Sequence, residues 1–200
     1  MKRKEIVTEF LASYRKRLIN LFDSIDKEML RAIIEAMINT FKNGNKLYVC
    51  GNGGSAATAS HIQADFRFFV RYFTGFRPKV MALTDNVPLM TAISNDNSYD
   101  DVFVEQMKGM FNKGDLLLAI SASGNSPNVI KAVEYAKELG GKTIGFCGFS
   151  GGKLKELSDM PLYTPNEDKD YGPIEDLHII LNHVLVNYLS QDEEFLGIEK

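Results

Sequence analysis

Short apolar runs alternate with amphipathic stretches along most of this chain. Five runs are typical of strands: Lys46–Cys50, Val80–Leu83, Leu116–Ile120, Lys142–Cys147 and Met160–Tyr163. Helical periodicity occupies the segments between and after them: Ala56–Phe73, Asp100–Phe111, Pro127–Leu139, Gly152–Ser158 and Ile174–Leu189. Mostly apolar strands that alternate with helices predict an α/β fold, with a parallel sheet covered on both faces. In such a sheet, ligands bind beyond the carboxyl ends of the strands.

The first 43 residues follow a different pattern, with two helices and no strand between them. Apolar residues recur at helical spacing on both sides of a polar break at 23–26: Ile6, Phe10, Tyr14 and Leu18, then Met29, Leu30, Ile33, Met37 and Phe41. Gly44 ends the second helix. We expect a single domain over residues 1–200, and we expect segment 1–43 to mediate oligomerisation because its apolar stripes need cover beyond one sheet face.

Composition narrows the class of protein further. A net charge of −3 over 200 residues argues against a partner such as nucleic acid, which needs a basic surface. Two cysteines do not make a disulfide framework, so a reducing, cytoplasmic location is expected. No apolar run approaches the roughly 20 residues of a membrane span, and no secretory signal is recognisable, so no membrane association is expected.

The turn at residues 121–127 reads Ser-Ala-Ser-Gly-Asn-Ser-Pro and lies between an apolar strand and a helix. Unpaired N–H groups and the macrodipole at a helix start favour an anion. Ser121, Ser123 and Ser126 add hydroxyl donors without adding charge, and Ala122 lies among them. The expected guest is a phosphate that is later released. Ser126 before Pro127 is also a good N-cap, so its role can be partly structural.

A second strand-to-helix turn contains Asn52, Gly53, Gly54 and Ser55. Its glycines allow the backbone to approach a ligand closely. The alternative is a tight turn with Ser55 as the helix N-cap. Because both turns follow strands of one sheet, they can converge on one anion.

All three histidines of the chain fall on two helices. His61 and Asp65 are spaced i, i+4, and Glu175 and His183 are spaced i, i+8, so each pair shares a helix face. Imidazole with carboxylate suits a divalent transition metal such as zinc. The alternatives are hydrogen-bonded pairs at the edge of the core and, for any lone histidine on an apolar helix, a satisfied core residue. Asn95-Asp96 can likewise be a helix-capping loop.

In order and spacing, these motifs resemble the phosphoheptose isomerases, which are sedoheptulose 7-phosphate isomerases of the sugar-isomerase (SIS) fold. The resemblance runs from about residue 5 to 190 and rests on Gly51-Asn52-Gly53-Gly54-Ser55, His61, Asn95-Asp96, Ser121-x-Ser123-Gly124-Asn125-Ser126, Glu175 and His183. It implies a flavodoxin-like, doubly wound, five-stranded parallel sheet with an N-terminal helical pair. It also implies a homotetramer with sites between subunits.

The resemblance also implies roles for individual residues. Ser121, Ser123 and Ser126, helped by Ser55, would hold the sugar phosphate. The sugar chain would be lined by Asn52, Gly53, Asn95 and Asp96, with Gly54, Ala122, Asp65 and Glu175 beside it. One Zn²⁺ per subunit would be bound by His61, Asp65, Glu175 and His183. Asp65 is the candidate base and His183 the candidate acid or proton shuttle.

Two positions depart from the family pattern, which usually has Glu at Asp65 and Gln at Glu175. The shorter Asp draws its carboxylate back by roughly 1.5 Å, and Glu175 adds a negative charge. The resemblance as a whole implies an aldose–ketose isomerase that converts sedoheptulose 7-phosphate to D-glycero-D-manno-heptose 7-phosphate, for lipopolysaccharide, capsule or another surface glycan. The alternative is a non-enzymatic SIS tetramer that binds the replication initiator DnaA. A sugar-phosphate-sensing regulator has less support, because no DNA-binding domain is attached.

Overall fold

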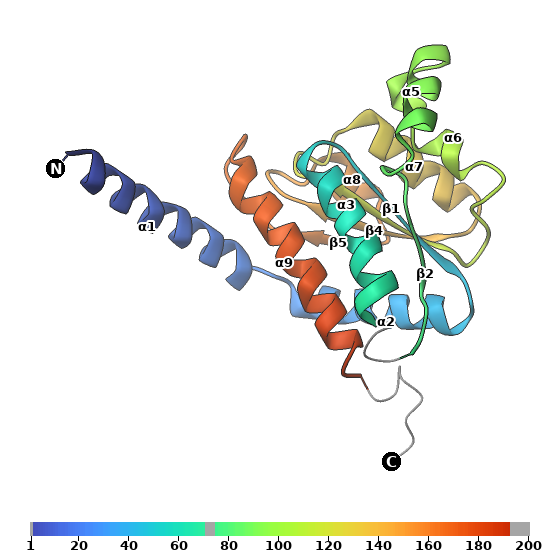
Figure 1. Ribbon diagram of the computed structural model, residues 1–200, viewed down its shortest axis with the longest axis horizontal. Helices are drawn as coiled ribbons and strands as arrows, with labels where there is room; N and C mark the ends of the chain where they lie inside the picture. The colour runs from blue at the N-terminus through green and yellow to red at the C-terminus, as the bar shows by residue number, and fades with distance from the viewer. Residues whose placement is uncertain (1, 71–74, 193–200) are drawn as a thin grey trace.

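A five-stranded, all-parallel sheet forms the centre of the molecule, with helices on both faces (Figure 1). The computed structural model describes residues 2–70 and 75–192. The strands are β1 Lys46–Gly51, β2 Lys79–Ala82, β3 Leu116–Ser121, β4 Lys142–Cys147 and β5 Met160–Tyr163, in the order β2-β1-β3-β4-β5. This topology confirms the predicted doubly wound α/β fold. The reversal of strand order places the ends of β1 and β3 side by side.

Two layers of helices bury the two faces of the sheet. The helices are α1 Lys2–Asp23, α2 Lys27–Lys42, α3 Gly54–Asp65, α5 Val87–Asp96, α6 Val104–Met107, α7 Pro127–Glu138, α8 Gly152–Leu157 and α9 Tyr171–Leu189. On one face, α2, α3 and α9 pack on Val49, Leu118 and Phe146. On the other face, α7 and α8 pack on Leu117 and Ala119. The two faces are thus buried by strand residues of alternate parity, as expected for a sheet covered on both sides.

One helical prediction needs correction, one helix was missed, and one predicted helix continues as a π-helical turn. The helix expected at Asp100–Phe111 is a 3₁₀ turn at Tyr99–Asp101 followed by the short α6, and Gly109 then takes a left-handed φ of +73°. Helix α5 was not predicted, because none of its residues is fully buried and only Met90 and Ile93 pack against the core. The segment Ala56–Phe73 is α3 continued by a π-helical turn, Phe66–Val70, and its residues 71–73 lie outside the described part of the chain.

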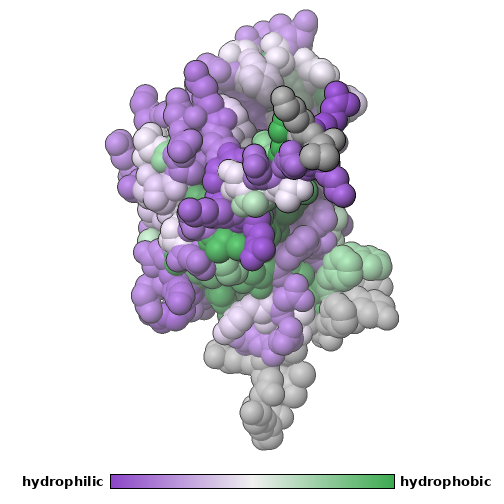
Figure 2. Space-filling view, turned by 90° about the vertical axis from the view of Figure 1, so that its left-hand side faces the viewer, coloured by the Kyte–Doolittle hydropathy of each residue, from purple (hydrophilic) through white to green (hydrophobic). Residues whose placement is uncertain are grey.

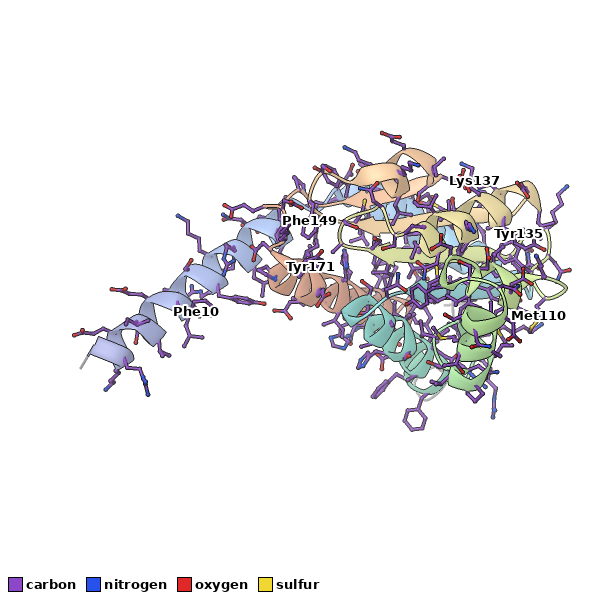
Figure 3. The ribbon with its side chains drawn as sticks, turned by 90° about the horizontal axis from the view of Figure 1, so that it is seen from above. Phe10, Met110, Tyr135, Lys137, Phe149 and Tyr171 are labelled. Atoms are coloured by element: carbon purple, nitrogen blue, oxygen red, sulfur yellow. The ribbon has the colours of Figure 1, made fainter. Side chains whose placement is uncertain are left out.

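Helix α1 projects from the body of the molecule (Figure 1). Its C-terminal half is anchored on α9, where Tyr14 donates to Asp176 at 2.5 Å, and on the preceding loop, where Arg17 pairs with Asp170 at 2.6 Å. Several large apolar side chains on α1 are 44–62% exposed: Ile6, Val7, Phe10, Leu11, Ile19 and Phe22. Figure 3 shows Phe10 on this helix, well away from the sheet. An apolar helix surface left uncovered in this way is typical of an interaction site.

Hydrophobic residues also gather in a hollow on the face shown in Figure 2, between hydrophilic ones. Among the described residues, no helix is both long and apolar enough to cross a membrane.

Candidate active site

The three serine hydroxyls of the turn at 121–126 lie close together. Ser121 Oγ lies 3.1 Å from Ser126 Oγ and 3.5 Å from Ser123 Oγ. The backbone N–H of Gly124 donates to Ser121 Oγ at 3.1 Å, and its φ of +66° lets the chain reverse there. Ser126 is the N-cap residue of α7, yet its side chain makes no capping hydrogen bond. Its hydroxyl therefore stays with the serine cluster rather than with the helix end.

This turn forms one wall of a cavity of about 130 Å³ beyond the ends of β1 and β3. The lining residues are Asn52, Ser55, Ile120, Ser121, Ala122, Ser123, Ser126, Tyr171 and Glu175. Three helices contribute their N-terminal ends: α3 through Ser55, α7 through Ser126 and α9 through Tyr171. Each N-terminus brings unpaired N–H groups and partial positive charge. The cavity is thus suited to an anion of the size of a phosphate group.

Asn52 lines this cavity, but its amide is already engaged. It exchanges two hydrogen bonds with the buried Asn128, at 2.8 and 2.9 Å, and its Oδ1 also accepts from Tyr99 Oη at 2.9 Å. Asn128, Tyr99 and Tyr171 were not identified from the sequence, since no spacing rule relates them to the glycine turn. The arrangement holds the turn after β1 rigidly against the start of α7.

The remaining predicted sugar contacts do not line this cavity. Gly53 is the N-cap of α3 and has a left-handed φ of +56°. Asn95 and Asp96 are exposed in the last turn of α5, where Asn95 Nδ2 donates to Asp96 Oδ1 at 2.8 Å. Neither lines the cavity of the single chain. Their contact with the sugar stays a prediction.

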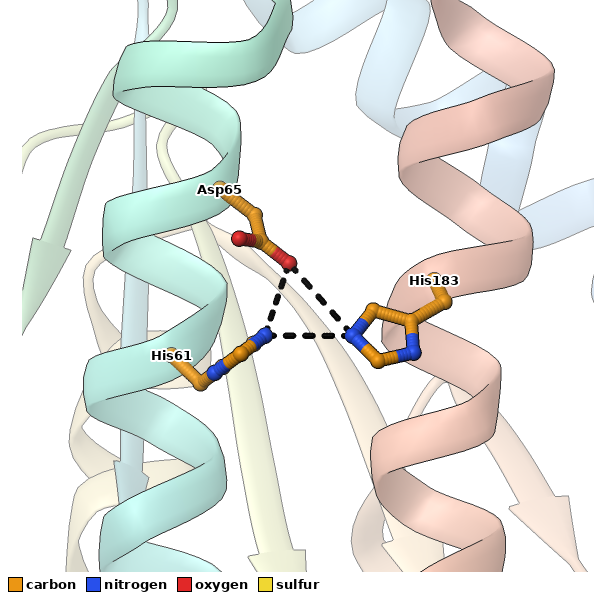
Figure 4. Close-up of side chains that lie close together, drawn as sticks. All are labelled: His61, Asp65 and His183. Atoms are coloured by element: carbon orange, nitrogen blue, oxygen red, sulfur yellow. Dashed lines mark hydrogen bonds and ion pairs between the residues drawn. The ribbon is translucent and has the colours of Figure 1, made fainter.

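Further along α3, three predicted metal ligands converge (Figure 4). His61 Nε2 lies 3.1 Å from His183 Nε2 and 3.0 Å from Asp65 Oδ2, and His183 Nε2 lies 3.8 Å from the same oxygen. Asp65 is buried, whereas both imidazoles are about half exposed. The group is therefore open to solvent on the histidine side and closed behind the carboxylate.

A fourth residue supports this triad and was missed from the sequence. Asn182, wholly buried on α9, donates from Nδ2 to Asp65 Oδ2 at 2.7 Å. Its neighbour on the same helix, His178, is buried against Phe146 and makes no hydrogen bond to the described residues. Burial lowers the pKa of His178 to about 3, so this histidine is neutral and belongs to the core. The structural alternative for a lone histidine is thus right about its place in the core, but His178 is not a satisfied residue, because neither ring nitrogen has a partner among the described residues.

Glu175 does not join the triad within one chain, which corrects the expected four-ligand set. It lies two turns before His183 on α9, about 12 Å along the axis. Its carboxylate instead lies against Gly54, where an added Cβ would be 2.4 Å from Oε2. Sharing a helix face does not mean sharing an axial position, and that distinction was overlooked. Burial, followed by the neighbouring Asp176, raises the pKa of Glu175.

The remaining three donors fit a zinc ion. Two imidazole nitrogens and one carboxylate oxygen lie within 4.8 Å of one another, with burial only on the Asp65 side. Catalytic zinc sites commonly have three protein ligands of these types and an open fourth position. His61, Asp65 and His183 are thus suited to hold zinc while leaving room for a substrate.

Helices α3 and α9, which carry these groups, run side by side in the same direction. Near their N-termini Gly54 meets Glu175, and about two to three turns later Asp65 meets Asn182. The anion cavity therefore lies at one end of the pair and the triad lies further along it. Both parts of the site rest on the same rigid elements.

Comparison with known proteins gives consistent results. The family described as "SIS domain" matches residues 9–148. The phosphoheptose isomerase of Aliarcobacter butzleri is 41% identical over 192 residues, which covers 95% of this chain and 98% of that protein. Two solved phosphoheptose isomerases are similar in structure. The one from Neisseria gonorrhoeae has a TM-score of 0.80 at 33% identity, covering 92% and 96% of the two chains. The one from Francisella tularensis has a TM-score of 0.85 at 29% identity, covering 96% and 100%.

Proposed function

The chain belongs to the phosphoheptose isomerases of the SIS-domain family, and from this premise we propose that it interconverts sedoheptulose 7-phosphate and D-glycero-D-manno-heptose 7-phosphate. The observation that best supports this proposal is that an anion cavity and a His–Asp–His triad lie on the same pair of helices. The relatives, which are phosphoheptose isomerases, support an enzymatic function rather than the alternative of a DnaA-binding protein. We place its product in surface-glycan heptose synthesis in the cytoplasm.

In the proposed reaction the phosphate binds among Ser55, Ser121, Ser123 and Ser126. Binding energy gained there, remote from the reacting carbons, helps to orient the other end of the sugar. Asp65 takes the proton from C1 of the ketose and returns it to C2, passing through an enediol. His183 moves the second proton between the C1 and C2 oxygens through its other ring nitrogen, Nδ1, because Nε2 faces the triad. Zinc held by His61, Asp65 and His183 would supply Lewis-acid polarisation of the carbonyl.

The direct test is incubation of the purified protein with sedoheptulose 7-phosphate, with and without added zinc, followed by analysis of the product. Formation of the manno-configured aldose would support the proposal. Turnover of another phosphosugar alone would contradict the assigned substrate, and activity that survives complete zinc removal would contradict the assigned cofactor.

We also propose a homotetramer built through α1. Its exposed apolar side chains support this, because a second copy would remove them from water. Wild-type protein should sediment near four times 22.4 kDa. Replacing Phe10, which is 61% exposed, by Glu should shift the protein to smaller species, whereas Glu9→Gln on the same helix should not. A monomeric wild type at micromolar concentration would contradict the tetramer.

Glu175 gives the site a predictable pH dependence. Its pKa is raised by burial and by Asp176, so the carboxylate becomes charged only as pH rises through that higher value. Above it, a negative charge faces the bound phosphate, and KM of the wild type should rise. Glu175→Gln removes that charge, so we expect KM near pH 8 to fall about tenfold, the effect of roughly 1.4 kcal/mol of repulsion.

The comparison needs KM of both proteins across the pH range. The two values should converge at acidic pH, where Glu175 is neutral, and zinc retention should be unchanged because Glu175 lies outside the triad. Parallel KM profiles for the variant and the wild type would show that Glu175 does not face the phosphate.

A further inference from the structure

Both imidazoles of the triad and one buried amide converge on a single carboxylate oxygen. Asp65 Oδ2 lies 3.0 Å from His61 Nε2, 3.8 Å from His183 Nε2 and 2.7 Å from Asn182 Nδ2. The asparagine comes directly before His183 on α9, so one short segment supplies both an imidazole and the amide. Of these partners, only Asn182 is wholly buried.

The other half of the Asn182 amide has no partner. Its Oδ1 is buried and makes no hydrogen bond to any described residue. An unsatisfied buried acceptor destabilises a fold, whereas an apolar side chain of similar size would fill the same space without that cost. Packing of α9 therefore does not account for an amide at this position. The amide is instead explained by the one hydrogen bond that it makes, which it donates to Asp65.

We propose that Asn182 is a positioning residue of the active site, which holds the Asp65 carboxylate with Oδ2 turned toward the two imidazoles. An aspartate side chain rotates about two torsions, and the two histidines beside it are about half exposed. The buried amide is the fixed point of the group. The catalytic meaning of this inference rests on the proposed function, whereas its geometric content does not.

The test compares three variants. Asn182→Leu keeps the size of the side chain and removes the hydrogen-bond donor. Asn182→Ala also removes the donor, with a smaller side chain that fits without rearrangement of its neighbours. Asn187→Ala on the same helix is the control, because Asn187 is exposed and donates only to the His183 carbonyl. For each protein we would measure zinc affinity by competition with a chelator, the urea unfolding midpoint, kcat and KM, and the metal-free crystal structure.

For Asn182→Leu we expect an unfolding midpoint at or above that of the wild type. Zinc affinity should fall about 10–100-fold, the usual effect of losing a residue that orients a metal ligand. The kcat value should fall while KM stays near that of the wild type, because the phosphate cavity is intact. The crystal structure should show the Asp65 carboxylate turned away from His61. Asn182→Ala should reproduce the loss of affinity, and Asn187→Ala should not.

Unchanged zinc affinity and an unchanged Asp65 orientation in both Asn182 variants would overturn the inference. So would a fall in stability alone, since that would make Asn182 a purely structural residue. If the wild type neither holds zinc nor isomerises the heptose phosphate, the proposed function fails. The metal-free crystal structures would still decide the inference, through the orientation of Asp65.

Discussion

Asp65→Ala and His183→Ala should each lower kcat/KM on sedoheptulose 7-phosphate by about 10²–10⁴-fold, the usual contribution of a general acid or base. Both residues are assigned a ligand role and a proton-transfer role, and both contribute to one compact group. Because the two act in one step, the double variant should be little worse than either single one. Steady-state kinetics on the three variants measures this directly.

Unfolding midpoints of the same variants should also be measured, because they distinguish a loss of catalytic activity from a loss of folded protein. His183 is half exposed, so its truncation should change the midpoint little. Near-wild-type kcat/KM in either single variant would remove that residue from the mechanism. Multiplicative losses in the double variant would show that the two residues act in separate steps.

Gly124→Ala should abolish phosphate binding and lower the thermal unfolding midpoint. A Cβ at this position would lie 1.9 Å from the carbonyl oxygen of Gly151, which is backbone and cannot swing aside. The φ of +66° adds a further cost of roughly 1–2 kcal/mol for any residue with a Cβ. Relief of the clash must displace the serine turn or the start of α8. The serine hydroxyls then no longer point to one phosphate position.

Gly109→Ala is the matched control for this prediction. Gly109 has a similar φ of +73°, but an added Cβ would meet nothing within 4 Å. It should therefore show only the left-handed penalty, with kinetics unchanged. Equal effects of the two substitutions would mean that the serine turn tolerates the displacement.

The sheet could be predicted from the sequence because its apolar runs are short, continuous and bounded by polar turns. The bounds of β4 and β5 are those expected, and the other strands differ by a residue or two. The region 87–111 was not predicted, because no residue of α5 is fully buried and only Met90 and Ile93 of this helix pack against the core. There the apolar residues of 100–111 suggested one helix, where Gly109 and a 3₁₀ turn divide the segment.

The site was predictable where residues are related by local spacing. Ser121, Ser123 and Ser126 belong to one turn, and His61 and Asp65 lie one helical turn apart. The approach of His183 to this pair follows from the packing of α9 on α3, and it was anticipated only through the family resemblance. Asn182 and Asn128 had no such guide, since an asparagine inside an apolar helix does not reveal its partner. The placement of Glu175 required the axial distance along α9.

Because α3 and α9 run parallel, the proposed site should discriminate between sugar phosphates by their length. Ser55 at the anion end and His61 in the triad are separated by about 9 Å of helix rise. A sugar phosphate too short to span that interval can still dock its phosphate, but its carbonyl stops before the triad. In the proposed reaction we therefore expect shorter phosphosugars to be inhibitors rather than substrates, with discrimination in kcat rather than in affinity. Selectivity of this kind needs no contact that recognises individual hydroxyl groups.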